Sequence, residues 1–149
     1  MTLAQQLDAV QRLFLDTAPI IYFVEKHPRY FPIARPIFER LDAGALVGVA
    51  SPITLAECLI HPYRMGHNDA VEMFTTLLIR QMDFVPIEAT IASQAAALRA
   101  RYNLSLPDAL QCAAALRAGC DAFLTNDIAL KRVTELDVLV LDEMRGWRP

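Results

Sequence analysis

The chain has 149 residues, of which 54% are hydrophobic and 21% are charged, and its formal net charge at pH 7 is −3. This composition excludes a disordered chain, and the length predicts a single globular domain, residues 1–149, with a substantial hydrophobic core. A weakly negative charge also argues against a protein that coats nucleic acid with a basic surface.

Short apolar stretches alternate with segments of helical periodicity along the chain. The first apolar stretch follows an N-terminal extension, residues 1–12, and a polar tail, residues 144–149, closes the sequence. The predicted strands are residues 13–15, 46–50, 84–87, 122–124 and 138–141. The predicted helices cover residues 19–24, 33–42, 52–65, 68–78, 90–103 and 105–119, with a short helix opening at residues 126–127.

These elements predict the fold class. Fully apolar strands joined by helical crossovers are typical of a parallel sheet that is covered on both faces. We therefore expect an α/β protein with three layers, α/β/α, around a central and mainly parallel sheet of about five strands.

The three cysteines form no C-x-x-C pair, and each lies among apolar residues, which predicts buried free thiols in a reducing compartment. The N-terminal residues lack the basic and then apolar pattern of a signal peptide. The longest apolar stretch, residues 45–60, is interrupted by polar residues and is too short to span a bilayer. We expect a protein of the cytoplasm with no membrane segment.

Four acidic residues stand where a strand gives way to a helix, or inside the helix that follows. Asp16 follows the first strand, and Asp127 follows the fourth. Asp108 begins a helix, and Glu57 lies within the helix that follows the second strand. Ligands of open parallel sheets bind outside the carboxyl ends of the strands, so these positions predict a shared site.

Each aspartate also has a purely structural interpretation, because a carboxylate near a helix N-terminus caps free N–H groups. Glu57 lies too deep in its helix to be a cap, and its neighbours are apolar. Converging carboxylates repel one another unless a cation lies between them, and no buried Lys or Arg partner is evident in the sequence. Mg²⁺ and Mn²⁺ favour carboxylate oxygen, and such sites suit phosphodiester chemistry.

Four segments carry a resemblance to a known family. In chain order they read LFLDTAPIIYFVE, ASPITLAECL, LSLPDALQCAAAL and AFLTND, between residues 13 and 127. In order and spacing they resemble the signature blocks of PIN-domain ribonucleases, and within them the VapC-like toxins of bacterial type II toxin–antitoxin pairs.

The resemblance implies a metal-dependent endoribonuclease that hydrolyses structured RNA, in the loops of transfer or ribosomal RNA. Its implied cofactor is Mg²⁺ or Mn²⁺, one or two ions, and its implied partners are RNA, a cognate antitoxin protein and a second copy of the chain. The family's catalytic and metal-binding acids correspond to Asp16, Glu57, Asp108 and Asp127. The blocks also place four supporting residues around the site: Thr17, Ser51, Thr125 and Asn126.

Two other functions stay open from the residues alone. A phosphatase or phosphoacceptor domain would use a nucleophilic aspartate, but no D-x-D pair follows Asp16. A non-enzymatic interaction module on the same fold would retain the acids as helix caps, and an absence of Mn²⁺ binding would favour it.

Overall fold

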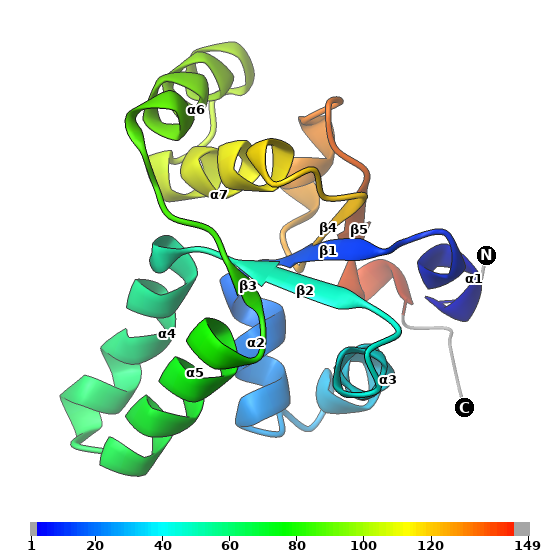
Figure 1. Ribbon diagram of the computed structural model, residues 1–149, viewed down its shortest axis with the longest axis vertical. Helices are drawn as coiled ribbons and strands as arrows, with labels where there is room; N and C mark the ends of the chain where they lie inside the picture. Colours follow the sequence, from blue (N-terminus) through cyan, green and yellow to red (C-terminus); the bar gives the residue numbers. More distant parts are fainter. Residues whose placement is uncertain (1–2, 145–149) are drawn as a thin grey trace.

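The computed structural model describes residues 3–144. Helices and strands alternate along the chain (Figure 1). The strands are β1 (Arg12–Leu15), β2 (Val47–Ala50), β3 (Asp83–Phe84), β4 (Ala122–Thr125) and β5 (Val138–Val140). The helices are α1 (Leu3–Asp8), α2 (Thr17–Val24), α3 (Phe31–Asp42), α4 (Pro52–Met65), α5 (Asn68–Arg80), α6 (Ala89–Tyr102) and α7 (Leu106–Arg117). Two short 3₁₀ helices, η1 (Ile128–Arg132) and η2 (Leu141–Met144), flank β5.

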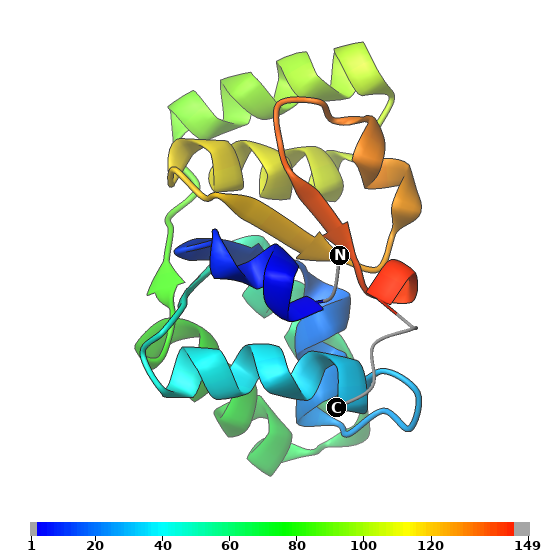
Figure 2. The ribbon, with the colours of Figure 1, turned by 90° about the vertical axis from the view of Figure 1, so that its right-hand side faces the viewer.

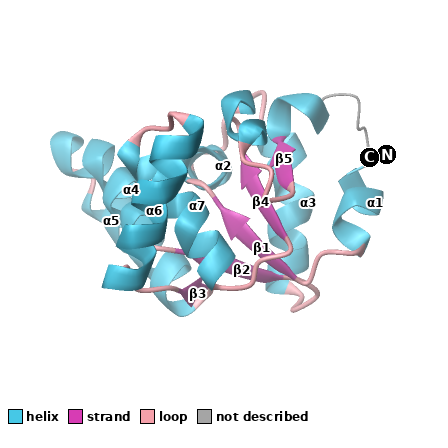
Figure 3. Cartoon of the chain, turned by 90° about the horizontal axis from the view of Figure 1, so that it is seen from above, coloured by secondary structure: helices cyan, strands magenta, loops and turns pink. Residues whose placement is uncertain are grey.

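The five strands form one sheet in the order β3-β2-β1-β4-β5, and every neighbouring pair is parallel (Figures 1 and 3). β1 lies in the centre, where Leu13 pairs with Gly48 of β2 on one side and with Ala122 of β4 on the other. The predicted α/β fold with a parallel, five-stranded sheet is confirmed.

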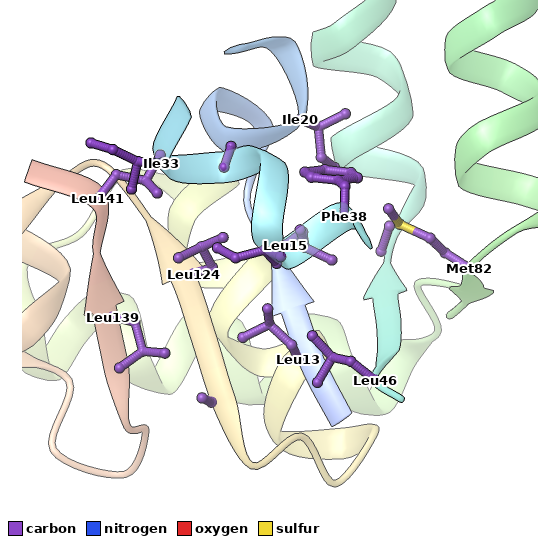
Figure 4. Packing of buried hydrophobic residues seen from close by; sticks show 14 of the residues in the cluster. Leu13, Leu15, Ile20, Ile33, Phe38, Leu46, Met82, Leu124, Leu139 and Leu141 are labelled. Carbon is purple, nitrogen blue, oxygen red and sulfur yellow. The ribbon is translucent and has the colours of Figure 1, made fainter. Parts of the chain in front are cut away.

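Side chains of successive strand residues enter two separate cores. Leu13 and Leu15 point to one face, where they pack with residues of α2, α3, α4 and α5 (Figure 4). Phe14 points to the other face, where it stacks on Phe123 and packs against α6 and α7. Figure 2 shows the sheet between these two helical layers. Because both faces are covered, the interior positions of β1, β2, β4 and β5 are apolar on both faces instead of alternating with polar residues.

The observed elements differ from the predicted ones at some ends. The third strand was predicted over residues 84–87, but β3 spans Asp83–Phe84 only, although the Val85 amide still donates to the Ala50 carbonyl. Pro86 has no amide hydrogen to extend the ladder. Within the predicted N-terminal extension, Leu3–Asp8 form α1 and Arg12 already belongs to β1. Leu7 and Val10 are buried in the core, so residues 3–12 are part of the fold. Most of the predicted polar tail, residues 145–149, lies outside the described residues.

The three cysteines are free thiols, as the sequence predicted. Cys58 and Cys112 are buried and free, and Cys120 is free and half-buried. Burial raises the pKa of each thiol to about 12, which keeps it protonated at neutral pH. Over residues 3–144, none of the helices has the length and apolar character that crossing a bilayer requires.

Candidate active site

The site lies at the carboxyl edge of the sheet, where the strand order reverses. From β1 the chain adds β2 and β3 on one side, and it later adds β4 and β5 on the other. Asp16 leaves β1 beside β4, and its backbone amide donates to the Leu124 carbonyl at 2.9 Å. Such a reversal opens a crevice in a parallel sheet because the two flanking connections run to opposite sides.

Asp16 is the most connected of the four acids. Its Oδ1 accepts the Thr17 amide at 2.9 Å, which caps α2, and its Oδ2 accepts the Thr125 hydroxyl at 2.8 Å. Thr125 is 1% exposed and ends β4, so it fixes this carboxylate between the two central strands. Asp16 therefore has both a capping role and a defined orientation toward β4.

Glu57 is tied to the same centre from α4. The Thr17 hydroxyl donates to Glu57 Oε1 at 2.8 Å, while the Thr17 amide donates to Asp16. Glu57 is half-buried, and it lies far past the Ser51 cap that opens α4. Thr17 thus hydrogen-bonds to two carboxylates, Asp16 and Glu57, that are 41 positions apart in the sequence.

Asp127 and Asp108 lie at the starts of two further elements. The Asp127 amide donates to the Thr125 hydroxyl at 3.1 Å, and its Oδ1 accepts the Ala129 amide, which caps η1. Asp108 lies in the first turn of α7, where its amide donates to the Ser105 hydroxyl. A continuous hydrogen-bond path therefore runs from Asp127 through Thr125 to Asp16, whereas Asp108 is linked to the others by charge.

The electrostatics show that the acids share one environment. Burial, together with the charges of Asp108 and Glu57, raises the pKa of Asp16 to about 6, against the lowering effect of its hydrogen bonds to Thr17 and Thr125. Burial also raises the pKa of Asp108, and the nearby charge of Asp127 adds to that rise. Carboxylates with this arrangement attract a cation.

None of the four acids has a cationic side-chain partner among residues 3–144, where the ion pairs involve other carboxylates. The chemistry of this donor set, carboxylate oxygens without a Lys or Arg, fits a hard divalent cation. Across the same described segment, however, no three His, Cys, Asp or Glu side chains are close enough to form a ready-made cluster. The acids share an electrostatic field without forming a closed cage.

The four predicted supporting residues divide into two pairs. Thr17 and Thr125 contact the acids directly, as described above. Ser51 is fully buried, and its hydroxyl caps α4 and donates to Gln111. The Asn126 side chain accepts the Asp142 amide at 3.0 Å, so it holds η2 against β4. Among the described residues, the side chains of Ser51 and Asn126 hydrogen-bond to groups other than the four acids.

Sequence reasoning did not single out Gln111. It is 1% exposed, lies one turn after Asp108 on α7, and hydrogen-bonds to Ser51 and to Thr54 of α4. The available signal was a glutamine inside an apolar stretch of the predicted helix, with AL before it and CAAAL directly after it. A polar residue in such a place needs buried partners.

Comparison with family models gives a match to the PIN domain over residues 13–136. The match covers β1 to the segment before β5, and thus all four acids. A search of curated proteins gave no significant match.

Solved structures share the fold at low sequence identity. A VapBC2 complex from Rickettsia felis, bound to a promoter DNA fragment, has a TM-score of 0.68 and 17% identity, covering 87% of this chain and 98% of the other. A toxin–antitoxin complex from Klebsiella pneumoniae has a TM-score of 0.67 and 21% identity, covering 87% and 97%. The sarcin–ricin loop cleaving toxin VapC20 from Mycobacterium tuberculosis has a TM-score of 0.65 and 21% identity, covering 81% and 94%.

Proposed function

This chain belongs to the PIN domain family, and from that premise we propose that it is a metal-dependent endoribonuclease and the toxin of a toxin–antitoxin pair. The observation that carries the proposal is the set of four acids, Asp16, Glu57, Asp108 and Asp127, at the carboxyl edge of the sheet. The charges of Glu57 and Asp108 contribute to the raised pKa of Asp16, and the charge of Asp127 contributes to the raised pKa of Asp108. None of the four acids has a cationic side-chain partner within the described residues.

The residues of the site would hold one or two Mg²⁺ or Mn²⁺ ions through their carboxylates. A bound divalent cation supplies an activated water and stabilises the leaving oxygen of a phosphodiester. The protein's own part is to hold its carboxylates ionised and oriented. The Thr125 hydroxyl donates to Asp16, which favours the charged form of that carboxylate, and the Thr17 hydroxyl donates to Glu57 and orients it.

The proposed substrate is structured RNA, cut in an exposed loop of transfer or ribosomal RNA. Unstacked bases in loops present the edges that a protein can read, whereas paired RNA hides them in a deep and narrow groove. The Mycobacterium tuberculosis toxin cleaves the sarcin–ricin loop, an RNA loop that belongs to this class of substrate.

Cleavage of RNA by purified protein tests the function. Total transfer and ribosomal RNA would be incubated with Mg²⁺, with Mn²⁺ or with excess EDTA. Asp16→Asn would be assayed beside the unmodified protein, with Asp121→Asn as the matched control. Asp121 lies at the opposite edge of the sheet, where its side chain accepts the Gln11 and Arg12 amides.

We expect discrete RNA fragments that require metal, persist in Asp121→Asn and disappear in Asp16→Asn. Fragments that survive in Asp16→Asn or in EDTA would contradict the proposal, because a contaminating or metal-independent nuclease would then be responsible.

The proposed protein partner is a cognate antitoxin with a basic amphipathic segment. A groove between α2, α3 and α5 has apolar walls that include Phe23, Leu77 and Met73, the last 55% exposed. Its charged lining consists of one basic residue, Lys26, and four acidic ones: Glu39, Asp42, Asp69 and Glu72. A co-expressed antitoxin should bind less tightly to Met73→Glu than to the unmodified chain.

A second copy of the chain is the other proposed partner. Ile60 and Tyr63, three residues apart on α4, are 50% and 65% exposed, which leaves apolar side chains of the kind that interfaces cover. Tyr63→Glu should shift a dimer toward the monomer in light scattering.

For such a toxin, whose substrate is RNA, the cytoplasm is the proposed location.

One observation favours a competing function, a non-enzymatic interaction module. Asp16 and Asp127 both cap helices, and the described residues form no ready-made metal cluster. Calorimetry with Mn²⁺ separates the two functions, since the nuclease requires Mn²⁺ binding that Asp16→Asn weakens and the module requires none.

A further inference from the structure

A chain of hydrogen bonds joins α4 and α7 one helical turn away from two of the acids. Gln111 lies three residues after Asp108 on α7, and Thr54 lies three residues before Glu57 on α4. Gln111 Nε2 donates to Thr54 Oγ1 at 2.7 Å, and Ser51 Oγ donates to Gln111 Oε1 at 2.5 Å. Because residues three apart share a helix face, these bonds connect the faces that carry Glu57 and Asp108.

The same hydrogen bonds fix the start of α4. Ser51 Oγ accepts the Ile53 amide at 3.1 Å, and Thr54 Oγ1 accepts the Ser51 amide at 3.2 Å, so the two residues form a capping box. Gln111 bonds to both members of that box. The first turn of α4 is therefore attached to α7 by a side chain that uses both ends of its amide.

Burial makes this connection stiff. Ser51 and Thr54 are 0% exposed and Gln111 is 1% exposed. In the part of the chain that the structure describes, Thr125 is the one other fully buried polar residue, and it bonds to Asp16. Hydrogen bonds inside a protein are stronger than those in water, and a fully satisfied buried network specifies one arrangement of the elements that it joins.

Hydrophobic packing alone does not require a glutamine here. The neighbouring α7 residues Cys112, Ala113 and Ala114 are fully buried and apolar, and an apolar side chain of similar length would fill the place without needing partners. The glutamine contributes a fixed distance and orientation between two helices. The distance between α4 and α7 in turn sets the separation of Glu57 and Asp108, the carboxylates that these helices carry.

We propose that Gln111 is a positioning residue of the active site, which holds Glu57 and Asp108 at the separation needed to share a divalent cation. This inference rests on the proposed metal-dependent function. Gln111 acts through the two acids and touches neither the cation nor RNA.

The test compares Gln111→Met with the unmodified protein in three measurements. Methionine keeps the length of the side chain and removes both hydrogen bonds. Calorimetry gives the affinity for Mn²⁺, cleavage of transfer RNA gives kcat and KM, and thermal melting in EDTA gives stability. Leu98→Ala creates a cavity beside α6, outside the site, and is the matched control for a loss of stability alone.

We expect Gln111→Met to lower the Mn²⁺ affinity and kcat by about 10–100-fold, as substitutions just outside a metal's ligands do, with the KM for RNA unchanged. Leu98→Ala should melt earlier but bind Mn²⁺ like the unmodified protein. Thr54→Val breaks the same connection from α4 and serves as the second variant if Gln111→Met does not fold.

Two results would overturn the inference in different ways. If the unmodified protein binds Mn²⁺ and Gln111→Met and Thr54→Val lose no more affinity than Leu98→Ala, Gln111 is merely structural and the proposed function stands. If the unmodified protein binds no Mn²⁺, the proposed function fails, and the role of Gln111 fails with it.

Discussion

Two aspartates lie at opposite edges of the sheet, one beside each end of β1, in opposite environments. Asp121 is exposed and accepts the Gln11 and Arg12 amides, each at 2.9 Å, and these hydrogen bonds hold its pKa below the usual value. Asp16 is partly buried, and its pKa is raised to about 6 by burial and by the charges of Asp108 and Glu57.

This difference indicates which of the two carboxylates is available to bind a cation. Asp121 has its charge satisfied by backbone donors and by the nearby Arg12, so its ionisation stabilises the fold. Asp16 lies among like charges, so its ionisation costs stability that a bound cation would return. Perturbed carboxylates of this kind mark functional sites.

The largest effect is expected from removing the charge of Asp108, one of the like charges near Asp16. Asp108→Asn is expected to reduce RNA cleavage by more than about 100-fold, because loss of a metal-holding carboxylate should exceed the effect of outer contacts. The pKa of Asp16 should fall, since one of the charges that raises it is gone. Initial rates and an NMR titration of the carboxyl carbons check both effects, and near-normal cleavage would contradict the role of Asp108.

Removing a hydroxyl should have the next largest effect. Thr125→Val keeps the shape of a buried side chain and loses its hydrogen bond to Asp16, so Mn²⁺ affinity should fall by about 10–100-fold. The pKa of Asp16 should rise, which moves the pH profile of cleavage to higher pH. Thr75→Val, which loses a bond to the Val71 carbonyl within α5, is the control and should leave both quantities unchanged.

Stability should depend on pH in the direction set by Asp16. The folded protein retains a proton that the unfolded chain releases above pH 3.8, so this stabilisation is present below pH 3.8 and is lost as the pH rises through about 6. The loss should be about 1–3 kcal/mol, since one pKa unit corresponds to about 1.4 kcal/mol. Urea unfolding in EDTA from pH 4 to 7 should show this loss relative to Asp16→Asn, and parallel curves would refute it.

Asp121→Asn should have a smaller and opposite effect. Its lowered pKa means that ionised Asp121 stabilises the fold above its usual pKa, and this stabilisation is lost as the pH falls. At pH 7 the melting temperature should decrease by about 2–4 °C, with RNA cleavage unchanged. If Asp121→Asn melted normally but cleaved RNA slowly, Asp121 would act in cleavage and not in stability, the opposite of what its environment predicts.

The smallest effect is expected at an ion pair near Asp121. Arg12 Nη2 lies 2.7 Å from Asp83 Oδ2, with the two side chains 31% and 47% exposed. Exposed pairs of this kind contribute about 0–1 kcal/mol. Asp83→Asn should therefore change the melting temperature by less than Asp121→Asn does, and a larger change would mean that Asp83 has a further role in β3.

The sequence predicted the fold well because its signals are local. Apolar stretches between helical segments gave the number and direction of the strands, and the acids followed them directly in positions 16 and 127. The weakest element was β3, because a strand of two residues leaves little pattern and Pro86 ends its ladder. The family predicted from the four sequence blocks is confirmed by the match over residues 13–136.

The interior of the site was harder to predict, because its contacts join distant residues. Ser51 and Gln111 are 60 positions apart, and no local pattern shows that they meet. The four sequence blocks placed Asn126 around the site as a supporting residue, and they gave no sign that its side chain accepts the Asp142 amide. The metal-binding roles of the four acids remain predictions, for which the structure supplies geometry and charge.

The order of the strands has a consequence for protein synthesis. β1 is made first among the strands, but one of its two neighbours in the sheet is β4, whose Ala122 pairs with Leu13. A ribosome that has released the chain only as far as Asn103 has produced Asp16 and Glu57 without α7, Asp108, Thr125 or Asp127. No truncated translation product of that length can carry all four acids, so the carboxylates of the candidate site come together only after the second half of the sheet has been added.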